Sequence, residues 1–111
     1  MAIKKYMTPG IKDKIGLLIQ VYIWEILSEY QKEKLEVEEE LDYFQSFELS
    51  LNEDSYLEIL HKEEVPNDYS KRYVLPDSTL SILQAEEYLG YIFVIANEEK
   101  HGFTMILANE Y

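Results

Sequence analysis

Apolar positions in the first third of the chain recur with the period of a helix. A short alternating run at residues 3–7 is followed by a predicted turn at Pro9 and Gly10. Over residues 11–34, apolar side chains then recur at spacings of three and four, which places them on one side of a helix. These side chains are Ile15, Ile19, Tyr22, Ile23, Ile26 and Tyr30. The pattern predicts a short strand, one long helix and a solvated acidic connection at residues 36–40.

From residue 41 onward the period falls to two, which is typical of half-buried strands. The expected strands are residues 41–51, 56–63, 71–75, 88–95 and 103–107. Asn52, Glu53 and Asp54 form a turn signal, so the first two strands predict a hairpin, and the last two predict another. Residues 77–87 fit either a short helix or a strand.

Together these elements predict a single domain over residues 1–111, of the α+β class, with one long helix packed on a mainly antiparallel sheet of about five or six strands. The chain is 47% hydrophobic and 14% aromatic, which excludes a disordered segment despite a net charge of −12. It has no cysteine, no apolar run of about 18 residues and no secretory signal pattern. We therefore expect a cytoplasmic protein that does not interact with a membrane.

Charge is divided unevenly along the chain. Residues 1–35 carry six lysines against four acidic residues, whereas residues 36–111 carry 18 acidic residues against four basic ones. The acidic second part repels the phosphates of nucleic acids and favours basic partners, so we expect no direct binding to DNA or RNA. The alternative is that the acidity only keeps the protein soluble.

The acidic residues expected to meet a partner come from three segments of the chain. Their carboxylates would pair with arginine and lysine side chains that otherwise hold phosphates. These residues are Glu36, Glu38, Glu39, Glu40, Asp42, Glu63, Glu64, Glu86 and Glu87. The predicted partner is accordingly a basic, nucleic-acid-binding protein.

The long predicted helix carries a second apolar stripe. At about 100° per residue, Leu17, Val21 and Trp24 lie nearly opposite the core-facing side chains. A helix packed on one sheet leaves such a stripe in water, and an exposed tryptophan beside two aliphatic residues is a typical anchor for a partner. Three alternatives stay open: another segment of the chain covers the stripe, the protein forms a homodimer, or a foreign partner binds.

Two histidines and many carboxylates raise the alternative of a metal site. His61 and Glu63 share a strand face, and His101 follows Glu98 and Glu99 in a predicted turn. Such nitrogen and oxygen ligands suit zinc or manganese, but no HExxH spacing supports them, and we predict no metal and no cofactor. The chain also has no nucleophile elbow and no glycine-rich phosphate-binding motif, so we expect no enzymatic activity.

Blocks of sequence spread along nearly the whole chain carry a family resemblance. They are residues 5–8 with Gly10 and Ile11, then residues 24–27, 41–49, 61–66 and 93–95, and finally the most specific block, residues 104–111. In these blocks the chain resembles a small family numbered nine-sixty in the domain-of-unknown-function series, found largely in Gram-positive bacteria, their phages and mobile elements. The resemblance implies no catalytic residues. Small acidic proteins from such sources often resemble inhibitors of host defence, including anti-CRISPR proteins and mimics of nucleic acid.

Our leading hypothesis is a non-catalytic interaction module from a phage or mobile element. It would inhibit a nucleic-acid-handling host defence protein by occupying that protein's phosphate-binding side chains. The first alternative is a housekeeping or accessory binding protein with no mimic role, which could form a homodimer through Leu17, Val21 and Trp24. The second alternative is a small metalloprotein.

Overall fold

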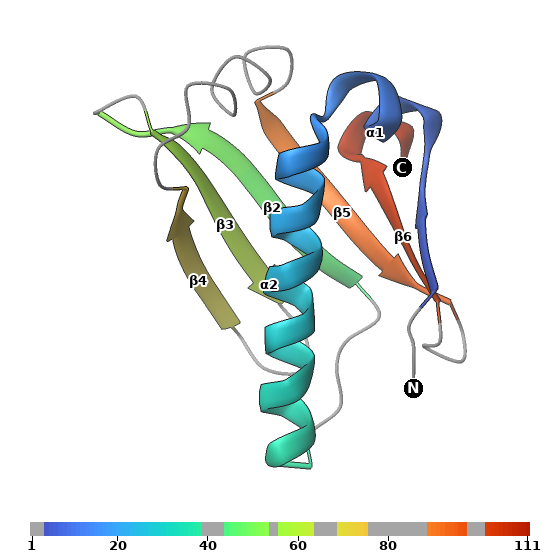
Figure 1. Cartoon of the computed structure of the whole chain (residues 1–111), viewed down its shortest axis with the longest axis vertical. Helices are drawn as coiled ribbons and strands as arrows, with labels where there is room; N and C mark the ends of the chain where they lie inside the picture. Colours follow the sequence, from blue (N-terminus) through green and yellow to red (C-terminus); the bar gives the residue numbers. More distant parts are fainter. Residues whose placement is uncertain (1–3, 39–43, 54–55, 64–68, 76–88, 98–101) are drawn as a thin grey trace.

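The computed structural model describes residues 4–38, 44–53, 56–63, 69–75, 89–97 and 102–111. They form two layers, a long helix on one face of a six-stranded sheet, which confirms the predicted α+β class (Figure 1). The strands are β1 (Lys4–Met7), β2 (Phe44–Leu51), β3 (Leu57–Glu63), β4 (Tyr69–Val74), β5 (Gly90–Ala96) and β6 (Gly102–Leu107). The helices are α1 (Pro9–Lys14), α2 (Leu17–Glu36) and the short 3-10 helix η1 (Ala108–Glu110).

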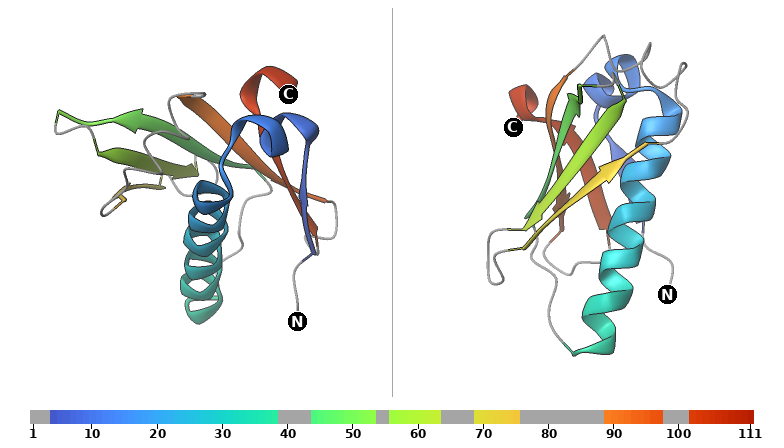
Figure 2. Two further views of the ribbon diagram at one scale, coloured as in Figure 1. Left: turned by 45° about the horizontal axis from the view of Figure 1, so that its top comes forward. Right: turned by 90° about the vertical axis from the view of Figure 1, so that its left-hand side faces the viewer.

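The strands follow the order β1-β6-β5-β2-β3-β4 across the sheet. Both predicted hairpins are confirmed, because β2 pairs with β3 and β5 pairs with β6 in antiparallel fashion. The pairing of β1 with β6 is parallel and joins the first and the last strand. Figure 2 shows α2 on one face of the sheet and the C-terminal segment on the other side. The ambiguous residues 77–87 lie outside the described residues.

The prediction of one helix over residues 11–34 is wrong at its start. Thr8 caps α1, since its side-chain oxygen accepts a hydrogen bond from the Ile11 amide at 3.4 Å. Pro9 takes the first helical position, where its missing amide hydrogen is not needed. Pro9 and Gly10 therefore begin a helix and do not form the predicted turn.

A break at Ile15 and Gly16 separates the two helices. Both residues have extended backbone conformations, and Gly16 is the cap residue of α2. The break leaves the Ile15 carbonyl outside the helical pattern, and the Gln20 side-chain amide donates to it at 2.7 Å. This buried hydrogen bond replaces the helical bond that the carbonyl lost. The helix α2 is therefore one long helix with a start six residues later than predicted.

The core lies between α2 and the facing side of the sheet. The helix contributes the predicted apolar positions, of which Ile19, Ile23 and Ile26 are at most 4% exposed. The sheet contributes alternate residues of its central strands, as the period of two predicts. These residues are Phe47, Leu49, Leu57, Ile59, Ile92, Val94, Phe103, Met105 and Leu107. No helix in the described part of the chain is both long and apolar enough to cross a membrane.

The segment after β6 fastens onto the start of α1. One carboxylate oxygen of Glu110 accepts from the Thr8 hydroxyl at 2.6 Å and from the Leu107 amide at 3.1 Å. The other oxygen accepts from the Gly10 amide at 3.3 Å. These hydrogen bonds, that of Thr8 first, lower the pKa of Glu110. The two ends of the described chain are thus joined through one carboxylate.

Candidate protein-interaction site

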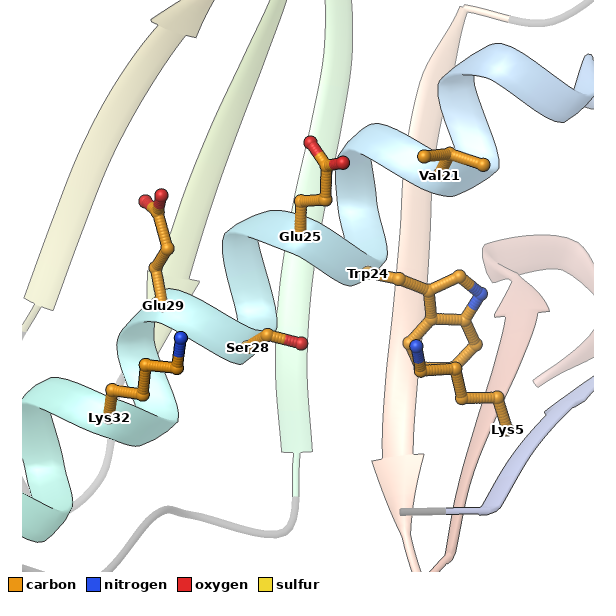
Figure 3. Close-up of a pocket in the computed structure, with 7 residues that line it drawn as sticks. All are labelled: Lys5, Val21, Trp24, Glu25, Ser28, Glu29 and Lys32. Atoms are coloured by element: carbon orange, nitrogen blue, oxygen red, sulfur yellow. The ribbon is translucent and has the colours of Figure 1, made fainter. Parts of the chain in front are cut away.

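The outer face of α2 carries exposed apolar side chains in its first turns. Leu17 is 72% exposed and Val21 is 42% exposed, as the predicted stripe requires. Trp24 departs from that prediction, because its side chain is only partly exposed and packs against the buried core. Trp24 lies about 60° round the helix from Val21, on the side that faces β1 (Figure 3). The stripe therefore divides into two exposed aliphatic residues and a tryptophan at the edge of the core.

A hollow of about 430 Å³ lies beside Trp24 along α2 (Figure 3). All of its lining comes from α2 except for one residue of β1. The lining residues are Lys5, Val21, Trp24, Glu25, Ser28, Glu29 and Lys32. Only Val21 and Trp24 of the seven lining residues are apolar, so the hollow suits a polar or charged side chain better than an apolar ligand.

Lys5 reaches this hollow because of the register of the edge strand. Lys5 lies beside Phe103 of β6, and Phe103 is buried on the side of the sheet that faces α2. Neighbouring residues of paired strands share a face, so the Lys5 side chain extends toward the helix. Its ammonium nitrogen lies 5.7 Å from the centre of the Trp24 ring. This distance is within the range of cation–π attraction, so the free protein already holds one cation at the ring.

Four glutamates form a column along the exposed face of α2. Glu25, Glu29, Glu33 and Glu36 follow one another at helical spacings, and all four are exposed. Like charges at such spacings repel one another and weaken an isolated helix by about 0.2 to 0.5 kcal/mol per pair. None of the four forms an ion pair within the described part of the chain. This glutamate column spans about 16 Å and leaves its carboxylates free to meet external cations.

Two glutamates of the column, Glu29 and Glu33, influence two tyrosines of β4. Burial raises the pKa of the Tyr73 hydroxyl; a hydrogen bond with Tyr69 opposes this rise, and the charges of Glu29 and Glu33 add to it. Burial, followed by Tyr73 and then Glu33, raises the pKa of Tyr69 to about 12. Glu29 and Glu33, but not the other two glutamates, therefore contribute to the raised pKa values on β4.

The predicted acidic residues fall into three groups. Glu36 and Glu38 are exposed at the end of α2. Glu63 is only 1% exposed, which contradicts its predicted place on an acidic surface, because its side chain takes part in hydrogen bonds inside the core. The others lie outside the described residues and are Glu39, Glu40, Asp42, Glu64, Glu86 and Glu87.

Glu63 belongs to a chain of buried hydrogen bonds that joins α2 to the sheet. The Tyr30 hydroxyl donates to one oxygen of Glu63 at 2.8 Å, and the Gln45 side-chain amide donates to the other at 2.6 Å. The Gln45 carbonyl oxygen lies 2.7 Å from His61 Nε2. All four residues are at most 2% exposed. A buried carboxylate is tolerated where hydrogen bonds satisfy it, so this chain holds the helix in one position on the sheet.

These hydrogen bonds determine which nitrogen of His61 carries the proton. Because Gln45 donates its amide hydrogen to Glu63, its carbonyl oxygen accepts from His61 Nε2–H. Nδ1 then carries a bare lone pair and has no hydrogen-bond partner among the described residues. The ring stacks on Phe47 with the ring centres 4.6 Å apart. Burial lowers the pKa of His61 to about 4, so the ring is neutral at neutral pH.

The structure uses His61 and Glu63 in this hydrogen-bond chain and not as an open ligand pair. Within the described residues no group of three or more histidine and carboxylate side chains is arranged to hold a metal ion. The other residues of the metal hypothesis, Glu98, Glu99 and His101, lie outside the described part of the chain.

Several residues of the hollow and of the buried chain were absent from the predicted site. Ser28 and Lys32 had a sequence signal, since they follow Trp24 by four and eight positions and so lie near it on the helix. Gln45 also had a sequence signal, because it is a polar residue at a position where the alternating strand pattern predicts a side chain that faces the core. Lys5 had none, because its approach to Trp24 depends on the pairing of β1 with β6.

The chain matches, over residues 4–110, the family model described as staphylococcal protein of unknown function (DUF960). A crystal structure of a protein of unknown function from Enterococcus faecalis has a similar fold, with a TM-score of 0.72 and 20% sequence identity, over 98% of this chain and 91% of that chain. At this identity the similarity shows the fold alone. No curated protein matches the chain. Since the family match covers nearly all of its residues, the chain belongs to the DUF960 family.

Proposed function

We propose that this protein is a non-catalytic interaction module that binds a basic protein through the outer face of α2. The observation that carries the proposal is the glutamate column, whose four carboxylates have no ion-pair partner within the described residues. Arginine or lysine side chains of a partner would replace the repulsion along the column by attraction. Binding would therefore relieve the repulsion between neighbouring glutamates of α2.

Apolar side chains at both ends of the column favour a protein partner over free cations. Leu17 and Leu18, near the start of α2, are 72% and 44% exposed. Leu35 and Val37, at the end of the helix, are 76% and 61% exposed. Large apolar side chains next to charged ones are typical of surfaces that bind another protein.

The finer proposal is that the partner binds nucleic acid and that this protein acts as a nucleic-acid mimic. A line of carboxylates about 16 Å long on one helix resembles a short run of phosphates in its charge. The net charge of −12 adds long-range attraction to a basic surface. On this proposal, the protein acts in the cytoplasm as a phage or mobile-element inhibitor of a host defence protein, as anti-CRISPR proteins do.

Affinity capture from the lysate of a Gram-positive bacterium tests the proposal. The variant Glu29→Gln/Glu33→Gln removes two charges from the glutamate column. The control variant Asp13→Asn/Glu53→Gln removes two exposed charges from other surfaces. We expect the wild type and the control to capture the same basic protein, and the column variant to bind it at least about tenfold more weakly. Duplex DNA should compete with the wild type for this protein.

Three other outcomes have distinct meanings. Equal capture by both variants would contradict the role of α2. Capture that DNA does not compete with would retain the interaction module and reject nucleic-acid mimicry. Recovery of only further copies of this chain, together with dimers in sedimentation that Leu17→Ser abolishes, would favour the homodimer alternative.

A further inference from the structure

We propose that the hollow beside Trp24 receives an arginine side chain of the partner and that Lys5 holds the place of this arginine in the free protein. The inference rests on the proposed function and specifies the chemistry of its anchor. It follows from three properties of the hollow, namely the exposed part of the Trp24 ring, the weakly held Lys5 ammonium and the polar groups along α2.

Trp24 offers an aromatic surface that already attracts a cation. One part of its side chain packs against the core, and another part lines the hollow. The Lys5 ammonium lies 5.7 Å from the ring centre. Lys5 is exposed on an edge strand whose four residues are all exposed, and it forms no ion pair within the described residues. A single cation–π contact of an exposed lysine is weak, so a better cation can replace it.

A guanidinium group matches the hollow better than an ammonium group does. Its flat face stacks on an indole ring, and its donors reach acceptors in several directions at once. The Ser28 hydroxyl lies on the same side of α2 as the Trp24 ring, and the carboxylates of Glu25 and Glu29 project on the other side of the hollow, one helical turn apart (Figure 3). An ammonium is a compact and strongly hydrated charge and cannot stack flat on the ring while it directs several donors outward. The lining therefore favours arginine over lysine as the anchor.

The two lysines of the lining, Lys5 and Lys32, repel a cation that enters the hollow. With Glu25 and Glu29 they bring the formal charge of the lining to zero, so a simple cation gains little from entering the hollow. A partner arginine that displaces Lys5 gains the aromatic surface, while Glu25 and Glu29 attract it from the other side of α2 (Figure 3). Removing the Lys5 ammonium should therefore strengthen the binding of arginine by more than the loss of one positive charge explains.

Lys4 provides the matched control for this effect. It is the exposed neighbour of Lys5 on β1, and alternation along a strand places it on the opposite face of the sheet. Lys4→Met and Lys5→Met thus change the net charge equally, but only Lys5→Met frees the ring of Trp24.

Fluorescence of Trp24, the single tryptophan of the chain, reports directly on the hollow. The probes are a short peptide of alternating arginine and glycine and the same peptide with lysine in place of arginine. We expect the arginine peptide to change the emission of Trp24 and to bind about fivefold more tightly than the lysine peptide. Lys5→Met should tighten arginine-peptide binding about fivefold and Lys4→Met less than about twofold, whereas Glu25→Gln/Glu29→Gln, which removes attraction across the hollow, should weaken it about threefold.

Trp24→Leu, measured by calorimetry, should also weaken binding about tenfold. Circular dichroism checks that this variant is folded. The tests with the Lys5 and glutamate variants remain valid even if Trp24→Leu does not fold. Equal effects of Lys5→Met and Lys4→Met would overturn the anchor. Binding of both peptides with unchanged emission would also overturn it, while the proposed function would stand because the glutamate column alone would explain such binding. If neither peptide binds at low salt, the anchor is rejected, and the capture experiment still decides the proposed function.

Discussion

Replacing His61 by glutamine should remove most of one pH-dependent contribution to stability. The folded protein keeps the His61 ring neutral, since burial lowers its pKa from 6.5 to about 4. Above pH 6.5 neither the folded nor the unfolded chain binds a proton at this ring. Between pH 6.5 and pH 4 the unfolded chain binds the proton and the folded chain does not, so the free energy of unfolding falls as the pH falls. Below pH 4 both states are protonated and this contribution no longer changes.

The size of the effect follows from the width of this window. A shift of one pKa unit corresponds to about 1.4 kcal/mol, so the fall from 6.5 to about 4 lowers the free energy of unfolding by about 3 kcal/mol in total. The structure gives the physical reason: protonation would place a hydrogen on Nδ1, which has no hydrogen-bond partner among the described residues. Glutamine does not titrate, and its amide can still donate to Gln45.

Urea unfolding followed by circular dichroism between pH 7.5 and pH 4 measures this effect. The carboxylates titrate in both proteins, so the difference between wild type and His61→Gln isolates the histidine. We expect this difference to be constant above pH 6.5 and to change by about 3 kcal/mol on the way to pH 4. A constant difference over the whole range would refute the argument, as would a pKa near 6.5 for the His61 ring in NMR titration of the folded protein.

Four further results are expected. Thr8→Ala removes the cap of α1 and a hydrogen bond to Glu110, so it should lower the free energy of unfolding by about 1 kcal/mol in denaturant titration, whereas Thr8→Ser should not. Trp24→Ala removes a partly buried ring and should cost about 2 kcal/mol in the same assay, against about 0.5 kcal/mol for the exposed Leu17→Ala; equal costs would contradict the packing of Trp24 on the core. The affinity of the partner complex should fall steeply between low and high salt in calorimetry, and a flat response would assign the interface to the apolar residues alone. The purified protein should not shift duplex DNA in a gel at physiological salt, because its net charge of −12 opposes the phosphates, and micromolar binding would contradict the mimic proposal.

The strands could be predicted because alternation is a local property of the sequence. Leu57, Ile59 and His61 occupy one phase of the pattern, and all three are buried in β3. The same alternation continues to Glu63, so the pattern also places the Glu63 side chain on the buried face of β3. The prediction of an acidic surface at Glu63 conflicts with this pattern, although an unpaired carboxylate is costly in a core. The partners that make its burial possible, Tyr30 and Gln45, come from other elements and were not visible from β3 alone.

The interruption before α2 was hidden by the spacing of isoleucines. Ile11, Ile15 and Ile19 keep a helical interval and all are buried, although the backbone between them is extended at Gly16. Apolar spacing reports which residues meet the core and does not report whether the backbone hydrogen bonds continue. Glycine and the capping residues carry that second kind of information.

The candidate site could be predicted only as far as one helix determines it. The exposure of Leu17 and Val21 follows from the period of α2. The partial burial of Trp24 and the contact with Lys5 do not, because they depend on the position of β1. Contacts between distant segments require the topology of the sheet, which alternation within single strands does not supply.

The parallel pairing of β1 with β6 has a consequence for the order in which the molecule is completed during synthesis. Among the strands in the described part of the chain, β1 is made before the others, yet its neighbour β6 is made after them, and Thr8 and Glu110 lie 102 positions apart. The helix α2 and the hairpin of β2 and β3 can form earlier, because their contacts are closer in sequence. The wall of the hollow that Lys5 provides is therefore added in a final step, after residues 102–107 have been made. Until that step the ring of Trp24 lacks the Lys5 ammonium, so a chain in which residues 102–107 have not yet been made presents the ring without its cation.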